Sequence, residues 1–302
     1  MTIRPARPSD AAPLVALRRT VFPYLVRGEA ATRRTLVTPP PGSSMASFVA
    51  LSGSGAVVGF AAAFKNTSTT SRYAGQISLL HVHPAFRGRG HGSALLAASI
   101  SHLRSLGLRD LRGYALPSSL PFAAARGFTA SREVRYSGLG LSAPLPPAPA
   151  LPAGYTLAPV SAISDRALFA AEAAGVADEP GDVAPDALTF EGWRYDVWED
   201  PGLDKEASFV VLSPAGEVAS LSLLQRDGDR CWSDMTATLP GHRGRGLARL
   251  AKTAALTRAA ATGATMAYTS NDASNGPMLA INTRLGYRPA ASTWSALITL
   301  PA

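Results

Sequence analysis

Two stretches of this sequence, PAFRGRGHGSALL (residues 84–96) and PGHRGRGLARLAK (residues 240–252), carry the same Pro-x-x-Arg-Gly-Arg-Gly motif. An apolar helical run follows the motif in each case, and the two copies lie 156 residues apart, about the length of one domain. The 302-residue chain is long enough for two domains that each bury a core. A repeat of this period predicts two copies of a whole domain rather than a solenoid.

A proline-rich segment separates the two motifs. APLPPAPALPA (residues 143–153) has five prolines and no charged residue. Because proline restricts the backbone to extended conformations, we interpret this segment as a semi-rigid spacer. The sequence therefore predicts an N-terminal domain over residues 1–142, a linker over residues 143–153 and a C-terminal domain over residues 154–302.

The two halves of the sequence predict the same order of secondary-structure elements. A strand and a helix come first, then a hairpin of two strands, a further strand, the Gly-rich turn, a helix, a strand, a short helix and a last strand. The helices after the turns are expected near residues 92–106 and 247–261. This order predicts an α/β fold with a mixed, mostly antiparallel sheet in each half and helices on both of its faces.

The composition excludes several classes of protein. No apolar run approaches the roughly 18 residues that span a bilayer, and MTIRPARPSD at the N-terminus does not have the pattern of a secretory signal, so we expect a cytoplasmic protein. The single cysteine, Cys231, rules out an intramolecular disulfide and is expected to be a small buried hydrophobe. His81 and His83 lack carboxylate or cysteine partners, so no metal site is expected.

The positive charge is confined to the first half of the sequence. Residues 1–142 carry a net charge of +13 and residues 143–302 a net charge of −5, which gives +8 for the whole chain. Such asymmetry can indicate nucleic-acid binding. The basic half has no recognised nucleic-acid motif, so a solvated basic surface is the favoured interpretation.

The Gly-rich turns have the composition of a diphosphate-binding site. A turn at the start of a helix presents backbone N–H groups that have no partner within the helix, and the helix dipole adds partial positive charge there. Neither copy fits the P-loop or the dinucleotide-binding motif; a surface turn with two arginines is the alternative. The proposed cofactor-binding residues of the turns are Arg87, Gly88, Arg89, Gly90, His91 and Gly92 in the first copy, and Arg243, Gly244, Arg245, Gly246, Leu247 and Ala248 in the second.

The paired motifs resemble the GNAT acetyltransferase superfamily, whose signature is Arg/Gln-x-x-Gly-x-Gly/Ala. FAAARGF (residues 122–128) and INTRLGY (residues 281–287) resemble the closing helix of that family, which ends in Gly-Phe or Gly-Tyr. The resemblance covers nearly the whole chain. It implies two tandem GNAT-like domains, each with a splayed pair of strands, and it implies acetyl-CoA as co-substrate.

The resemblance also assigns functions to single residues. In the family, the turn holds the pyrophosphate of acetyl-CoA and a tyrosine in the closing helix often protonates the departing thiolate. The position of that tyrosine is Ala123 in the first half and Asn282 in the second, so neither half has the usual acid. Further cofactor contacts are assigned to the strand before each turn, at Leu80, Val82, Thr236 and Thr238.

The second half is better equipped for catalysis. Asp234, Thr236 and Thr238 alternate along the strand before its turn, which predicts that they lie on one face. We expect Asp234 to be the base or the group that positions the amine; a surface or ion-paired aspartate is the alternative. Asn271 and Asn275 are assigned to the cofactor site by resemblance, or else are turn and cap residues. Asn282 is expected to orient the thiolate or a water.

An acidic stretch follows the first helix of the second half. Residues 178–206 contain ten Asp or Glu, interleaved with Trp193, Tyr195 and Trp198. Substrates of the family enter near this region, so we expect a wall that attracts a cationic amine, with aromatic rings for cation–π contact. A solvated acidic loop is the alternative.

These features favour an acetyl-CoA-dependent N-acetyltransferase that acts on a primary amine, either a cationic small molecule or a peptide. A coenzyme-A-binding regulatory or scaffold protein and a nucleic-acid-associated acetyltransferase are the alternatives. No metal and no membrane partner is expected, and the protein is expected to be a monomer or a homodimer.

Overall fold

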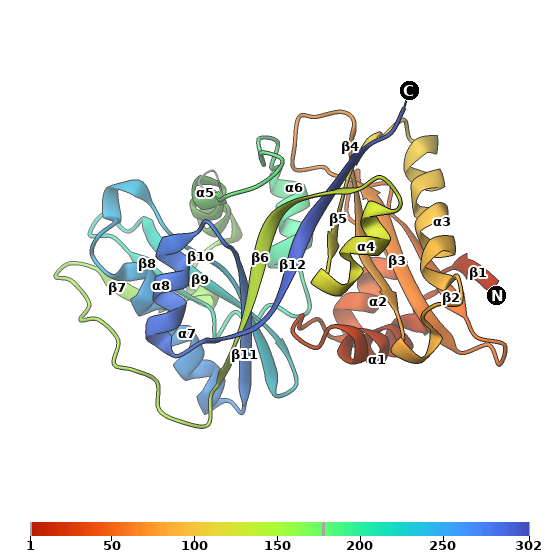
Figure 1. Ribbon diagram of the computed structural model, residues 1–302. Coiled ribbons are helices and arrows are strands. Elements are labelled where there is room, and N and C mark those ends of the chain that lie inside the picture. Colours follow the sequence, from red (N-terminus) through yellow and green to blue (C-terminus); the bar gives the residue numbers. More distant parts are fainter. Residues whose placement is uncertain (1, 177–178, 302) are drawn as a thin grey trace. The chain divides into compact units, whose positions relative to one another are not determined.

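The computed structural model describes residues 2–176 and 179–301, which fold into two compact units (Figure 1). Unit 1 comprises Met1–Val134 and Ser292–Ala302, and unit 2 comprises Arg135–Ala291. This division differs from the predicted boundaries, because the last strand of the chain belongs to unit 1 and the boundary between the units falls before residue 142. Residues 143–153 lie within unit 2, and their function as a spacer stays a prediction.

Unit 1 is built on a sheet of order β1-β2-β3-β4-β5-β12. Strands β4 and β5 are parallel, and the other neighbouring strands are antiparallel. Its strands are β1 (Thr2–Pro5), β2 (Ala46–Leu51), β3 (Val57–Lys65), β4 (Ala74–Val82), β5 (Asp110–Ala115), the part of β12 (Arg288–Thr299) from Ser292 onward, and the start of β6 (Thr129–Gly140).

Helices cover both faces of the unit 1 sheet. Val49 packs with helix α1, whereas its neighbour Ala50 packs with α3, and successive residues of a strand face opposite sides. The helices are α1 (Ala11–Val21), α2 (Glu29–Val37), α3 (His91–Ser105) and α4 (Leu120–Ala124), with single 3₁₀ turns η1 (Pro8–Asp10), η2 (Pro84–Phe86) and η3 (Pro117–Ser119).

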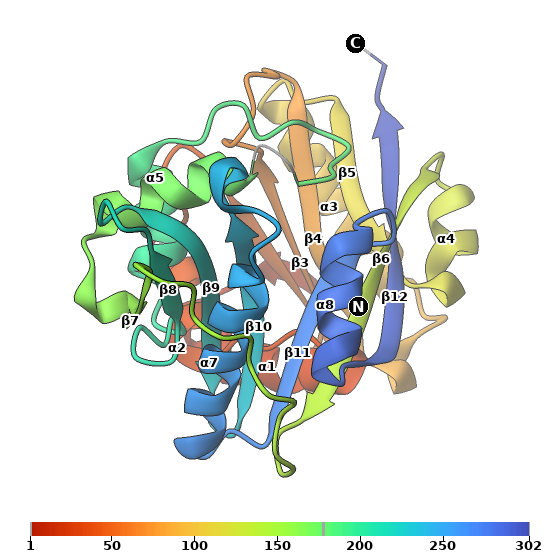
Figure 2. The ribbon, with the colours of Figure 1, turned by 90° about the vertical axis from the view of Figure 1, so that its left-hand side faces the viewer.

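Unit 2 repeats this plan with the strand order β6-β11-β10-β9-β8-β7 (Figure 2). Strands β10 and β11 are parallel, while β10, β9, β8 and β7 pair antiparallel. Besides β6, its strands are β7 (Thr156–Pro159), β8 (Phe209–Leu212), β9 (Val218–Asp227), β10 (Arg230–Thr238) and β11 (Met266–Asp272).

Helices α5 and α7 of unit 2 lie on opposite faces of its sheet. Val210 packs in the cluster of α5, whereas Val211 packs in the cluster of α7. The helical segments are α5 (Asp165–Val176), α6 (Phe190–Trp193), η5 (Arg194–Trp198), α7 (Leu247–Ala261) and α8 (Gly276–Leu285), with the 3₁₀ turns η4 (Val160–Ala162) and η6 (Pro240–His242).

The predicted fold class is confirmed, with helices that the sequence analysis did not anticipate. Helix α2 and the α6–η5 segment are additional, and both are short and rich in charged residues, so their apolar period is weak. Within the described residues, no helix combines the length and apolar character needed to cross a membrane.

Candidate active site

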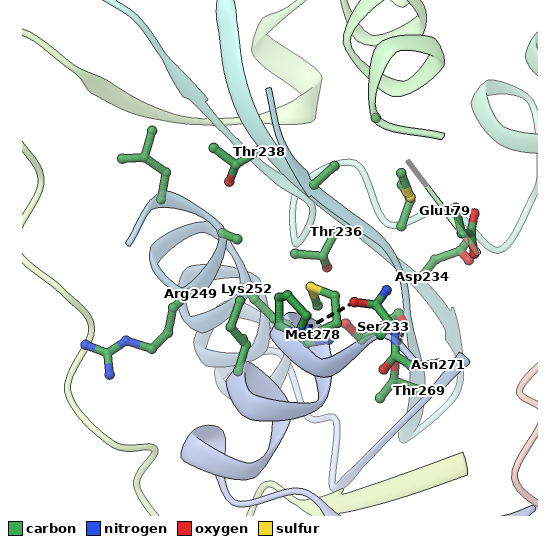
Figure 3. Close-up of a pocket in the computed structure, with 18 of the residues that line it drawn as sticks. Glu179, Ser233, Asp234, Thr236, Thr238, Arg249, Lys252, Thr269, Asn271 and Met278 are labelled. Carbon is green, nitrogen blue, oxygen red and sulfur yellow. Dashed lines mark hydrogen bonds between the residues drawn. The ribbon is translucent and has the colours of Figure 1, made fainter. Parts of the chain in front are cut away.

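Strands β10 and β11 of unit 2 separate and open a cavity of about 870 Å³ (Figure 3). Their parallel pairing covers only residues 230–232 and 266–268. Beyond this point residues 233–238 of β10 and residues 269–271 of β11 line the cavity and no longer pair with each other, while β10 stays paired with β9 on its other side. The separation exposes backbone groups of β10 to any molecule that enters the cavity.

The Gly-rich turn forms one end of this cavity. Gly244 and Gly246 have left-handed φ angles of 77° and 76°, a backbone conformation that residues other than glycine rarely adopt. Gly246 is also the N-cap of α7. The turn residues that line the cavity are Arg243, Gly244, Gly246, Leu247 and Ala248. A helix N-terminus of this kind binds anions through its free N–H groups. These residues therefore fit the diphosphate of acetyl-CoA.

The arginines of the turn have structural contacts of their own. Arg243 Nε donates to the carbonyl of Thr238 at 3.0 Å, which ties the turn to the end of β10. The Arg245 guanidinium lies 5.9 Å from the Tyr155 ring centroid, and Arg245 is not among the cavity-lining residues. The structure therefore supports diphosphate binding by the backbone amides of the turn more than it supports binding by the two arginine side chains.

Three carboxylates lie at the other end of the cavity. Glu172 comes from α5, Glu179 from the segment after it, and Asp234 from β10. Figure 3 shows Glu179 and Asp234 at one end of the cavity, with Arg249 and Lys252 of α7 at the other. Sequence analysis singled out Asp234 but missed Glu172, whose signal was only a lone carboxylate in the Ala-rich helix DRALFAAEAAGV.

Asp234 is held in place by two N–H donors. Gln225 Nε2 donates to Oδ2 at 3.1 Å and Trp232 Nε1 donates to Oδ1 at 3.3 Å. Thr236 and Thr238 follow it along the cavity wall, and their hydroxyls hydrogen-bond to serine hydroxyls of β9 at 3.0 and 2.9 Å. All three predicted residues therefore line one cavity, although a register shift between Ser233 and Thr236 interrupts the simple alternation expected of the strand.

Glu172 is a buried carboxylate with a perturbed pKa. Trp193 Nε1 donates to its Oε2 at 2.9 Å. Burial raises the pKa of Glu172 to about 7, and the nearby carboxylates Asp234 and Glu179 act in the same direction, while the hydrogen bond from Trp193 opposes them. A carboxyl group that titrates near neutral pH in a cavity is typical of an acid or base in catalysis.

Lys252 is a second titratable residue that the sequence analysis did not single out. It lines the cavity from α7, is only 1% exposed, and its Nζ has no hydrogen-bond partner among the described residues. Burial lowers the pKa of Lys252 to about 7, so much of it is uncharged at neutral pH. Burial also raises the pKa of the Cys231 thiol to about 12, consistent with the expected small hydrophobic residue.

The three asparagines of the second half occupy different places. Asn275 lines the cavity and also caps α8 by accepting from the N–H of Met278 at 3.3 Å, so the structure is compatible with both interpretations of this residue. Asn271 lines the cavity and accepts from Asn282 Nδ2 at 2.6 Å. Asn282 itself is buried and is not among the lining residues. The structure thus suggests that Asn282 positions Asn271 rather than contacting a substrate.

Comparisons with known proteins agree with this geometry. Residues 18–128 match the model of the Acetyltransferase (GNAT) family. A mycothiol acetyltransferase of Streptomyces bingchenggensis is 30% identical over 217 residues, which cover 69% of this chain and 68% of that protein. The chain belongs to the GNAT acetyltransferase family. It is an N-acetyltransferase, and proteins of this family use acetyl-CoA.

Two solved structures share the complete GNAT fold of this chain. A tandem GNAT protein from the clavulanic acid biosynthesis pathway superposes with a TM-score of 0.74 at 21% identity and covers 100% of this chain and 99% of its own. A GCN5-related N-acetyltransferase from Sphaerobacter thermophilus has a TM-score of 0.73 at 18% identity, covering 99% and 95% of the two chains. The tandem arrangement expected from the repeated motif is therefore confirmed.

The first GNAT turn has the same backbone as the second. Gly88 and Gly90 are left-handed, with φ angles of 73° and 84°, and Arg87 Nε donates to the carbonyl of Val82 at 3.2 Å. The surrounding side chains differ: the His91 side chain is buried and Arg89 lies over Phe86 at 5.3 Å. Leu80 and Val82 pack against the core, and Gly92 faces Phe122 and Val82. Coenzyme binding at the first turn stays a prediction.

The acidic stretch does not form the expected wall. Trp193 and Tyr195 are buried, and Trp193 packs in the core of unit 2, so neither presents a ring to a substrate. Trp198 packs against the same core, and Lys205 lies over its ring at 3.7 Å. Among the described residues of the stretch, Glu179 lines the cavity, while Asp178 lies outside the described residues. The aromatic residues interrupt the charges because they anchor the segment.

Proposed function

We propose that unit 2 is the catalytic unit and acetylates a primary amine of a cationic small molecule, with the amine of cysteinyl-glucosaminyl-inositol as the first candidate. The mycothiol acetyltransferases among the relatives support this acceptor. Three carboxylates in the cavity support a cationic amine in general, because an ammonium group compensates their charge.

One observation carries the proposal. The cavity of unit 2 runs from the Gly-rich turn, which suits a diphosphate, to the carboxylates, which suit an ammonium. Both substrates of an acetyl transfer therefore have complementary groups within a single cavity. Holding two reactants in one site removes much of the entropic barrier to their reaction.

Different residues of unit 2 would have different functions along the cavity. The amides of Gly244, Gly246 and Leu247 would hold the diphosphate of acetyl-CoA, which supplies an acetyl group activated as a thioester. Asp234 would bind the acceptor ammonium, since two N–H donors already fix its carboxylate. Asn271, held by Asn282, would orient a polar group near the reaction centre.

The experiment compares the two turns. Purified protein is incubated with acetyl-CoA and cysteinyl-glucosaminyl-inositol, or with a panel of other primary amines. The loss of thioester absorbance and the acetylated product are measured, because a thiol-release assay would also detect the thiol of the acceptor. Gly246→Trp places a side chain on a left-handed residue whose Cβ would lie 3.3 Å from Pro149, and it should abolish acetyl-CoA binding and turnover.

Gly90→Trp is the matched control, since Gly90 is the left-handed N-cap of α3 in unit 1. It should strain its turn similarly but leave turnover largely unchanged. Loss of turnover in well-folded Gly90→Trp with normal turnover in Gly246→Trp would move the active site to unit 1. Binding of acetyl-CoA by the wild type without acetylation of any amine would instead indicate a coenzyme-binding regulatory protein.

A further inference from the structure

Glu172 lies where it can exchange a proton with a molecule in the cavity. Its helix α5 packs closely on β10, because a Cβ on Gly175 would lie 2.8 Å from the Ala237 Cβ. Trp193 Nε1 donates a hydrogen bond to Oε2 of Glu172, and no described residue hydrogen-bonds to Oε1 of Glu172. The side chain lines the same cavity as Asp234. One carboxylate oxygen is therefore fixed and the other is left for a ligand.

The groups around Glu172 explain its proton affinity. Strand β9 contributes Leu221 and Leu223 to the cluster around α5, and η5 contributes Val197 and Trp198, so these elements desolvate the carboxylate. The charges that act on it are two carboxylates, Asp234 on β10 and Glu179 after α5. The charged side chain of Arg194 on η5 pairs instead with Asp165 and Glu199.

Asp234 and Glu172 differ in a way that separates binding from proton transfer. Both oxygens of Asp234 accept hydrogen bonds from side-chain N–H groups. Glu172 has a single donor and is more deeply enclosed. Pairs of carboxylates in different surroundings commonly have different functions in one reaction.

We propose that Glu172 is the base that deprotonates the acceptor ammonium while Asp234 holds that ammonium in place. This inference rests on the proposed function. The proton moves from the ammonium nitrogen to Oε1 of Glu172, and the nitrogen keeps the electron pair. The neutral nitrogen then attacks the thioester carbonyl, the carbon–sulfur bond breaks with its electrons on sulfur, and a proton from the nitrogen passes to the thiolate. Glu172 afterwards releases its proton to solvent.

The first test is the pH dependence of kcat, which reports on groups in the complex with substrates. With cysteinyl-glucosaminyl-inositol as acceptor, the kcat of the wild type should fall toward acid pH as Glu172 becomes protonated. Glu172→Gln can still accept from Trp193, so it should fold, and kcat should fall by about 100-fold or more with the pH dependence removed. The KM for acetyl-CoA should stay unchanged. Glu191→Gln, an exposed change on α6, is the matched control.

The second test shifts the pKa without removing the carboxylate. Trp193→Phe removes the hydrogen bond that lowers the pKa of Glu172, so the acid limb of the kcat profile should move to higher pH. Glu179→Gln removes a charge that raises this pKa, so the limb should move to lower pH. A merely structural function of Glu172 would not give opposite shifts in these two variants.

The outcomes separate the two proposals. If Glu172→Gln keeps kcat and the acid limb, Glu172 is not the base; if Asp234→Asn alone removes the limb, Asp234 is the base. Calorimetry of acceptor binding in two buffers of different ionisation enthalpy gives a readout independent of turnover, and Glu172→Gln should change the number of protons exchanged. A wild type that acetylates no amine would overturn the proposed function itself.

Discussion

Two single residues of the cavity, Glu172 and Lys252, are titratable groups that the fold keeps away from water. Burying an ionisable side chain costs free energy unless it is paired, so such groups are uncommon in cores. Their pKa values move toward 7 from opposite sides, because burial disfavours the carboxylate of one and the ammonium of the other. Residues kept despite such a cost are typical of functional sites.

Replacing Lys252 with methionine should stabilise the protein at neutral pH. The pKa of Lys252 is about 7 in the folded state against 10.5 for a free lysine, so unfolding takes up a proton between these values and becomes less favourable as the pH rises. Lys252→Met, a change of similar volume, should raise the free energy of unfolding at pH 7 by about 2–4 kcal/mol.

Urea unfolding of both proteins at pH 6.5, 8 and 9.5 checks this expectation. The advantage of Lys252→Met should be largest at pH 6.5 and should shrink as the pH rises toward 10. A difference that does not depend on pH, or a more stable wild type, would show that Lys252 is better solvated than its burial indicates.

At the scale of elements, the contact between α5 and β10 places Glu172 beside Asp234. Gly175 makes this contact possible, since any side chain there would meet Ala237 and Met235 of β10. The same helix packs its apolar face against Leu221 and Leu223 of β9. The close approach of α5 to β10 at the carboxylate end of the cavity therefore depends on one glycine of a packed helix.

Gly175→Val should move α5 away from β10 and disturb the carboxylate end of the cavity, where we propose that the acceptor binds. We expect a loss of about 1–3 kcal/mol in stability from overpacking, and a higher KM for the amine with little change in the KM for acetyl-CoA. Steady-state kinetics and thermal unfolding measure both effects. Gly140→Ala, at a position with nothing within 4 Å of the added Cβ, is the control. Unaltered amine kinetics in Gly175→Val would contradict an acceptor site between α5 and β10.

At the scale of the whole molecule, the chain returns to its first unit at the end. Residues 294–299 of β12 pair with residues 110–115 of β5, and Ala296 and Leu300 lie in the core of unit 1. The end of β6 contributes Leu139 to the core of unit 2. Each unit thus contains strand residues from the other half of the sequence, so the compact units of the structure do not coincide with the two halves of the sequence.

Fragments cut at the structural boundary should behave better than fragments cut at the sequence repeat. A fragment of residues 154–302 would carry the end of β12 without β5 and would lack Leu139 and Leu141 of its own core. A fragment of residues 135–291 keeps unit 2 complete. We expect the fragment 154–302, whose boundary follows the sequence repeat, to aggregate through its unpaired strand, and the fragment 135–291 to unfold cooperatively.

Size-exclusion chromatography and circular dichroism of the two fragments provide the measurement. Equal solubility and equal melting temperatures would show that β12 and the end of β6 contribute little to either unit. Aggregation of both fragments would indicate that neither unit is stable without the rest of the chain.

The sequence by itself determined the duplication, the GNAT family, the two Gly-rich turns and the helices after them, because these depend on local spacing of glycine, arginine and apolar residues. It also pointed to Asp234, whose position before the second turn is local. Only the tertiary structure decided which residues meet in the cavity. Glu172 and Lys252 come from helices whose sequence shows no special pattern, and their burial and altered pKa values arise from packing against distant strands. The prediction that the aromatic residues of the acidic stretch face a substrate was wrong for the same reason, because these residues face the core of unit 2. The direction of a side chain in an irregular segment depends on the partner it packs against.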